Sequence, residues 1–85
     1  MISSGSDSVG TAATLIDGSH NSSFRLVIHN NDNSDAIYLG GSTVGTATGY
    51  QLQKLESIDL LLSAGSELYA VSGKTGHSIS WLKIT

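Results

Sequence analysis

The sequence predicts a small all-β protein, an antiparallel β-sandwich or barrel of about seven short strands with a flexible N-terminal arm. Short apolar stretches alternate with Gly, Asn, Asp and Ser, which is the spacing of strands joined by turns. No window keeps apolar residues at the i, i+3, i+4, i+7 spacing of a helix. The chain has 85 residues, so we expect a single domain.

The expected strands follow one another within residues 11–85, the range of the predicted β-domain. The clearest is Phe24–His29, in which Phe24, Leu26 and Ile28 alternate with the other three residues. In chain order the expected strands are Thr11–Ile16, Phe24–His29, Ala36–Leu39, Tyr50–Leu52, Ser57–Leu62, Leu68–Ser72 and His77–Ile84. Tight turns separate most of them, for example Asp17-Gly18, so the pairing should be chiefly antiparallel.

Residues 1–10 are rich in Ser and Gly and predict a flexible arm, because such a segment buries little apolar surface. The arm is either a disordered terminus or a segment that becomes ordered on a neighbouring subunit. The first residues also lack the positive and apolar regions of a signal peptide. We therefore expect a protein that stays in the cell or is exported by another route.

Charge and composition exclude several functional classes. The net charge is −3 and the four cations are scattered, so no basic surface is expected for nucleic acid. No apolar run approaches the length of a membrane helix, and no membrane partner is predicted. The chain has no cysteine, which rules out disulfides and thiolate metal sites.

Small domains often need support from disulfides, metals or oligomerisation, and only the last is left open by this composition. Several expected strands carry apolar residues on both faces, as at Val27 and Leu61. We therefore predict a homo-oligomer, with a trimer favoured. Apolar and tyrosine side chains on the strands and the arm are the interface candidates: Ile2, Val9, Val27, Tyr38, Tyr50, Leu61 and Tyr69.

The chemical motifs are weak, and no catalytic, cofactor-binding or metal site is predicted. Gly73-Lys74-Thr75 lacks the earlier glycine and the following helix of a phosphate-binding loop. His20, His29 and His77 are too far apart for a local metal motif. The turn around Asp32 lacks the glycine and the final Glu of a known calcium loop. We therefore expect a binding protein and not an enzyme.

The second half of the chain resembles small β-domain structural proteins of tailed bacteriophage virions. The resemblance is carried by Ala36–Val44 (AIYLGGSTV), Thr48–Leu52 (TGYQL) and Leu68–Ser72 (LYAVS), in that order. Val9–Leu15 in the first half fits as well, so the resemblance covers nearly all residues after Val9. One departure is Leu55-Glu56, where the family usually has a turn that contains Gly. This departure affects the expected turn type and not the fold.

The resemblance implies a capsid decoration, or cement, protein that binds the assembled shell and stabilises contacts between neighbouring capsomers. It implies that the partner is a major capsid protein, and that the protein is made in the host cytoplasm and located on the capsid surface of the virion. An alternative is a head-fibre, neck or tail module that contacts a host surface or glycan. Glycan binding would need an exposed aromatic platform such as Trp81, but the position of Trp81 in mid-strand among apolar neighbours favours the core instead. A small hydrolase is a third hypothesis, supported only by the many Ser, His and Asp residues.

Overall fold

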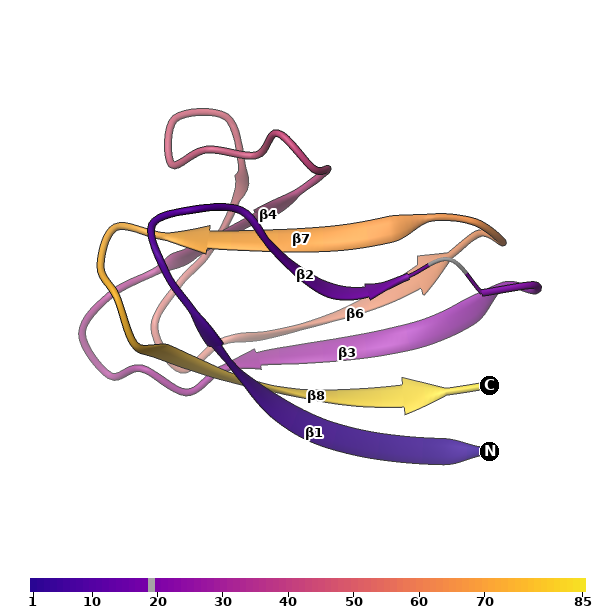
Figure 1. Ribbon diagram of the computed structural model, residues 1–85. Helices are drawn as coiled ribbons and strands as arrows, with labels where there is room; N and C mark the ends of the chain where they lie inside the picture. Colours follow the sequence, from indigo (N-terminus) through magenta and orange to yellow (C-terminus); the bar gives the residue numbers. More distant parts are fainter. Residues whose placement is uncertain (19) are drawn as a thin grey trace.

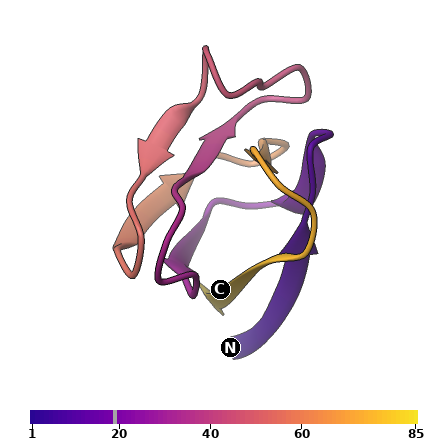
Figure 2. The ribbon, with the colours of Figure 1, turned by 90° about the vertical axis from the view of Figure 1, so that its left-hand side faces the viewer.

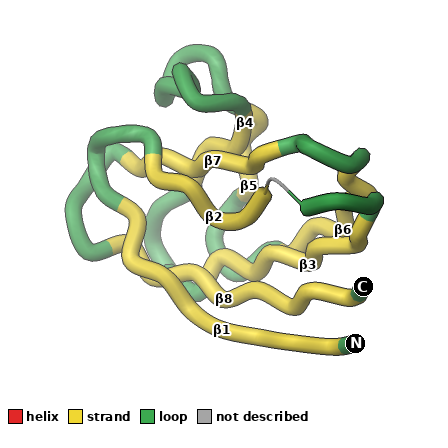
Figure 3. Tube along the Cα trace, turned by 45° about the vertical axis from the view of Figure 1, so that its right-hand side comes forward, coloured by secondary structure: helices red, strands yellow, loops and turns green. Residues whose placement is uncertain are grey.

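The computed structural model describes residues 1–18 and 20–85. Within them the chain forms eight β-strands and no helix, which confirms the predicted all-β class (Figures 1 and 3). The strands are β1 (Ile2–Val9), β2 (Thr14–Gly18), β3 (Phe24–Asn30), β4 (Ile37–Gly40), β5 (Tyr50–Leu52), β6 (Ser57–Leu62), β7 (Glu67–Ser72) and β8 (His77–Ile84).

The strands form two antiparallel sheets of four strands each, which face each other as a β-sandwich. Sheet A has the order β1-β8-β3-β6 and sheet B has the order β2-β7-β4-β5. Figure 2 shows the strands arranged around a central region, which the core side chains fill. The edge strands define two open sides of the sandwich. We call them the β1/β2 flank and the β5/β6 flank.

The N-terminal segment is part of sheet A, so the prediction of a flexible arm is wrong. All eight residues of β1 pair with β8, from Ile2 opposite Ile84 to Val9 opposite His77 (Figure 1). The Ser and Gly side chains bury little surface, but the backbone groups of β1 bond to a strand that is already held by β3. Val9 at the end of β1 is fully buried in the core.

Strand β2 begins and ends later than the sequence predicted. The predicted strand was Thr11–Ile16 with a turn at Asp17-Gly18, whereas the observed strand is Thr14–Gly18. The pairing with β7 shifts register between Leu15 and Asp17, which is a β-bulge. The extra residue in the bulge is Ile16, which is buried. The bulge lets the strand continue through residues that usually form turns.

The core lies between the two sheets and follows the alternation of the strands. Phe24, Leu26 and Ile28 of β3 are buried while the residues between them are not, as the sequence predicted. Burial of each such side chain stabilises the fold by about 1.5–3 kcal/mol. The buried cluster comprises Val9, Ile16, Phe24, Leu26, Ile28, Ile37, Leu39, Leu52, Leu68, Ala70 and Ile79.

Candidate functional site

The β1/β2 flank is closed by polar side chains of the chain itself. Asp17 Oδ2 lies 3.2 Å from Lys83 Nζ, which joins β2 to β8 across the two sheets. Asp17 Oδ1 accepts a hydrogen bond from the Gly18 N–H at 2.8 Å and lies 2.8 Å from His20 Nε2. Burial acts to raise the pKa of Asp17, but the bonds to His20 and Lys83 outweigh it and lower the pKa. The carboxylate is thus held charged within the flank.

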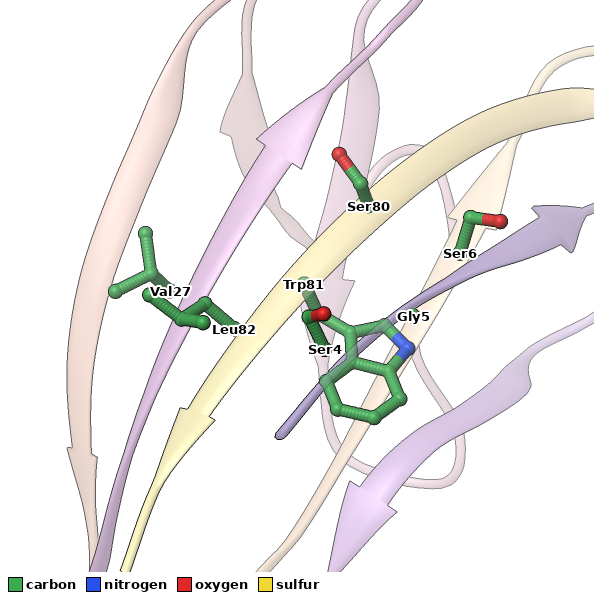
Figure 4. A pocket seen from close by; sticks show the side chains of 7 residues that line it. All are labelled: Ser4, Gly5, Ser6, Val27, Ser80, Trp81 and Leu82. Carbon is green, nitrogen blue, oxygen red and sulfur yellow. The ribbon is translucent and has the colours of Figure 1, made fainter. Parts of the chain in front are cut away.

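Trp81 completes this flank on the side of sheet A. Its Nε1–H donates a hydrogen bond to Asp7 Oδ2 at 3.1 Å, and the Lys83 ammonium lies 5.8 Å from the ring centroid. The ring packs against Gly5, where a Cβ atom would lie 2.7 Å from Cζ2 (Figure 4). Trp81 is half-buried and held on both sides, so it is not the exposed platform that glycan binding would need.

The β5/β6 flank has the opposite character, because it opens into an apolar cleft. The cleft has a volume of about 340 Å³ and is lined by Leu39, Gly40, Tyr50, Ile58, Leu60 and Leu68. Tyr50 is 62% exposed at the cleft, and both β5 and β6 are edge strands with one neighbour each. Edge strands of this kind leave one row of backbone groups unpaired in the sheet.

The turn between β5 and β6 contains an unusual residue. Leu55 has a φ of 57° and is 56% exposed. This left-handed conformation is uncommon for any residue except glycine and is strained for a leucine. The backbone of the turn is well bonded: the Leu55 N–H donates to Asp32 O at 3.2 Å, and Glu56 Oε1 accepts from the Gln53 N–H at 2.8 Å. The fold therefore fixes the backbone of Leu55 while its side chain faces solvent.

The outer face of sheet A is a second apolar surface. Ile2 lies opposite Ile84 in the register of β1 and β8, and Leu82 lies opposite Val27 in the register of β8 and β3. Leu61 on the neighbouring strand β6 is 75% exposed. A shallow hollow of about 490 Å³ on this sheet is lined by Ser4, Gly5, Ser6, Val27, Ser80, Trp81 and Leu82 (Figure 4). The Arg25–Asp59 ion pair, at 2.5 Å, crosses the same face.

Ser72, His77 and Asn30 are linked by buried hydrogen bonds, with an asparagine where a Ser–His–Asp triad has its aspartate. His77 Nδ1 lies 2.9 Å from Ser72 Oγ, and His77 Nε2 lies 2.7 Å from Asn30 Oδ1. All three side chains are at most 1% exposed, and Ser72 Oγ also accepts a hydrogen bond from the Lys74 N–H at 3.2 Å. Burial lowers the pKa of His77 and favours the neutral ring. Asn30 Nδ2 donates hydrogen bonds to Asp35 O, Leu52 O and Gln53 O, so these bonds fasten loops to the core.

The acidic turn after β3 is neutralised by a lysine. Lys74 Nζ lies 2.5 Å from Asp32 Oδ2 and 3.0 Å from Asp35 Oδ2. Hydrogen bonds from Lys74 and Ser34 hold the pKa of Asp32 far below its usual range. The hydrogen bonds of Lys74 to Asp32 and Asp35 raise the pKa of Lys74. Among residues 1–18 and 20–85, no group of three His, Asp or Glu side chains is placed to hold a metal ion.

The predicted interface residues lie in four different places. Ile2, Val27 and Leu61 are on the outer face of sheet A, Tyr50 lines the cleft, Tyr38 and Tyr69 are half-buried on the outer face of sheet B, and Val9 is in the core. The prediction is wrong for Val9, because a fully buried side chain cannot contact a partner.

Sequence reasoning missed Leu55, Leu82 and Ile84. The alternation of His77–Ile84 could have indicated the last two, since Leu82 and Ile84 share the parity of Ser78 and Ser80.

Comparisons with known proteins add one structural likeness. No family model and no curated protein matches the sequence. A solved structure described as "Bacillus endospore appendages form a novel family of disulfide-linked pili" aligns with a TM-score of 0.60 and 12% identity. The alignment covers 100% of this chain and 85% of that chain, and it shows a shared fold. Within the described residues, no helix is long and apolar enough to cross a membrane.

This likeness corrects the predicted function. The sequence was interpreted as a phage capsid decoration protein, or alternatively a fibre, neck or tail module. The similar structure is instead a subunit of a bacterial endospore pilus, and we withdraw the capsid function and its alternative. The resemblance to phage virion β-domains is untested by the comparisons, as are the major capsid protein as a partner and the virion as a location.

Proposed function

We propose that this protein is a structural subunit that assembles with copies of itself into a protein filament, such as a surface appendage. The observation that carries the proposal is the apolar β5/β6 flank, an open cleft whose lining is almost entirely apolar. The exposed leucine and isoleucine side chains on the outer face of sheet A form a second apolar surface. Contiguous exposed apolar surface on a small soluble protein marks a site of interaction.

The structural likeness supports a filament over a closed oligomer. The aligned structure belongs to pili, and the alignment spans this whole chain. The sequence independently predicted a homo-oligomer, for which a trimer was favoured. A pilus subunit needs contacts that do not close on themselves, because head-to-tail contacts that fail to close produce open filaments. A trimer would instead require closure after three copies.

The linkage between subunits must differ from that of the aligned pili. Those pili are described as disulfide-linked, whereas this chain has no cysteine. We propose that its filaments are held together by non-covalent contacts, with apolar burial as the main attraction. Many modest contacts repeated along a filament give a strong overall association. No catalytic role is part of this proposal.

The test is assembly of the purified chain as a function of concentration. We expect light scattering to show growth beyond the 8.8 kDa monomer, and negative-stain electron microscopy to show filaments. A reducing agent should have no effect on either measurement, because there is no thiol to reduce. A discrete trimer would support self-association but reject the filament. A monomer at every concentration, up to the millimolar range, would reject the proposal.

A further inference from the structure

The loops that join β3 to β4, β5 to β6 and β7 to β8 gather at the end of the sandwich opposite the two chain ends (Figure 1). Asn30, the last residue of β3, is fully buried among them. Its side-chain nitrogen donates hydrogen bonds to Asp35 O at 3.0 Å, Leu52 O at 3.2 Å and Gln53 O at 3.1 Å. Three carbonyl acceptors around Nδ2 identify it as the nitrogen of the amide, so Oδ1 is an acceptor.

The orientation of Asn30 fixes where the neighbouring histidine carries its hydrogen. Because Asn30 Oδ1 only accepts, its bond of 2.7 Å to His77 Nε2 requires a hydrogen on that nitrogen. In the neutral ring Nδ1 then has no hydrogen, and it accepts the Ser72 O–H at 2.9 Å. The Lys74 N–H donates to Ser72 Oγ at 3.2 Å, so the hydroxyl hydrogen of Ser72 is available for the ring. Every donor in this network therefore has an acceptor when His77 is neutral.

A second proton on His77 would disrupt this arrangement. It would bind at Nδ1, where the Ser72 hydroxyl would lose its acceptor, and it would charge a ring that is 0% exposed. Both ring bonds go to neutral groups, an amide and a hydroxyl, which compensate a buried charge less well than a carboxylate does. Burial accordingly lowers the pKa of His77.

The charged groups that face His77 are bonded to one another. Asp32 and Asp35, in the turn after β3, act to raise the pKa of His77, and Lys74, in the loop before β8, acts to lower it. Lys74 Nζ lies 2.5 Å from one carboxylate and 3.0 Å from the other. From β1, the residue opposite His77 is Val9, which is apolar and buried. Burial therefore outweighs these charges.

We propose that His77, with Ser72 and Asn30, forms an acid-sensitive latch: a proton on Nδ1 breaks the bond from Ser72, and the charged ring leaves its buried site. Asn30 Oδ1 then loses one of its two donors and keeps only the Asp32 N–H. The loops that Asn30 holds are released, and with them the end of β5, since Leu52 O is one of the three carbonyls. The proposal goes beyond the filament function, because the latch acts within one copy and does not require assembly.

The lowered pKa of His77 sets the direction of the pH dependence. The ordinary pKa of the ring is 6.5 and the pKa in the folded state is lower, so the opened chain binds a proton at a higher pH than the closed one. The latch should hold fully above pH 6.5 and weaken as the pH falls from 6.5 towards the folded pKa. The carboxylates of Asp17 and Asp32 act in a separate range, below their ordinary pKa of 3.8.

The first experiment follows the wild type between pH 7.5 and pH 5. Nitrogen chemical shifts of the His77 ring, read by NMR from the monomer in solution or from the assembled protein as a solid, should show a hydrogen on Nε2 and none on Nδ1 at pH 7.5. Hydrogen exchange read by mass spectrometry should then report the opening. Protection factors of residues 53–56 should fall by about tenfold for each pH unit below 6.5, because opening takes up one proton. Residues 79–84, in the interior strand β8, should keep theirs.

The second experiment removes the titrating ring. His77→Gln keeps an amide donor for Asn30 and cannot take up a proton in this pH range. The variant should be less stable than the wild type at pH 7.5, but the protection of residues 53–56 should stay constant down to pH 5. The matched control is His29→Gln, which changes a histidine on the outer face of β3 whose ring is bonded to Asn31. The control should keep the wild-type response to acid.

A hydrogen on Nδ1 at pH 7.5, or a second proton taken up at or above pH 6.5, would reject the latch. Protection of residues 53–56 that does not change between pH 6.5 and pH 5 would also reject it. If His77→Gln folds and keeps the wild-type response to acid, another group is responsible and the latch is wrong. If the variant does not fold, the ring shifts and the exchange of the wild type decide. None of these measurements requires filaments, so the filament function is tested separately.

Discussion

The space between the two sheets is closed at one flank of this sandwich and left open at the other. On the β1/β2 flank, the space between the sheets is closed by Trp81, Lys83 and Asp17, whose polar groups bind one another or nearby groups. On the β5/β6 flank, the residues between the sheets are apolar and part of the cleft stays open. A flank closed by its own polar groups supports the monomer, and an open apolar flank gains stability only when another surface covers it.

Among the changes that test this difference between the flanks, Lys83→Met should have the largest effect on the free energy of unfolding. This change leaves the Asp17 carboxylate charged within the flank without its cation, while much of the packing of the lysine chain is kept. We expect the free energy of unfolding to fall by about 2–3 kcal/mol, measured by urea denaturation of the monomer. Lys54→Met, at an exposed position in the turn of the other flank, is the control and should change it by less than about 0.5 kcal/mol. Equal effects of the two changes would remove the difference between the flanks.

A smaller effect is expected from Gly5→Ala. The added Cβ atom would lie 2.7 Å from Trp81 Cζ2, so the indole must move and its hydrogen bond to Asp7 must lengthen. We expect a loss of about 1–2 kcal/mol in the free energy of unfolding. The emission of Trp81, which is the only tryptophan, should also change in the folded state. Gly41→Ala is a suitable control, because a Cβ atom there would meet nothing within 4 Å. Unchanged emission and stability in Gly5→Ala would show that Trp81 does not depend on this contact.

The smallest expected effect is a dependence of stability on pH, which arises from Asp17 on the β1/β2 flank. The pKa of Asp17 is lowered in the folded state, so its contribution to stability is complete above the unfolded pKa and is lost as the pH falls through the folded pKa. The wild type should therefore be more stable than Asp17→Asn at pH 5, and the gap should narrow below pH 3.8. Melting temperatures measured from pH 5 to pH 2 test this expectation. A gap that widens as the pH falls would contradict the assigned direction of the pKa shift.

The sequence predicted the strands that have an apolar pattern and missed the one that does not. Phe24–His29 was recognised because Phe24, Leu26 and Ile28 alternate, and the observed strand continues by only one residue. Strand β1 was missed because its sequence has almost no apolar side chain to reveal an inner face. Strand β1 is ordered because its backbone pairs with β8, and each residue of β1 lies more than 67 positions along the chain from its partner in β8.

The apolar cleft was harder to predict for a related reason. The cleft appears only when side chains from β4 to β7 are brought together between two sheets, and spacing along the chain does not show which edge stays open. The turn at Leu55-Glu56 was recognised as lacking the usual glycine, but the sequence did not show that Leu55 itself would take the left-handed conformation. Val9 was misplaced because an apolar residue after a Ser-rich segment gives no sign of its depth.

The pairing of β1 with β8 also brings the two ends of the chain side by side. The Met1 amine donates a hydrogen bond to Thr85 O at 2.5 Å, and the Thr85 N–H donates to Met1 O at 2.8 Å. Neighbouring ends of this kind are what makes circular permutation feasible in small domains. A short linker could join them, and the chain could then be reopened in the loop between β4 and β5, which protrudes away from both ends (Figure 1). Peptides fused at residues 1 and 85 would emerge from the same pole of the domain, so two different peptides would be displayed side by side.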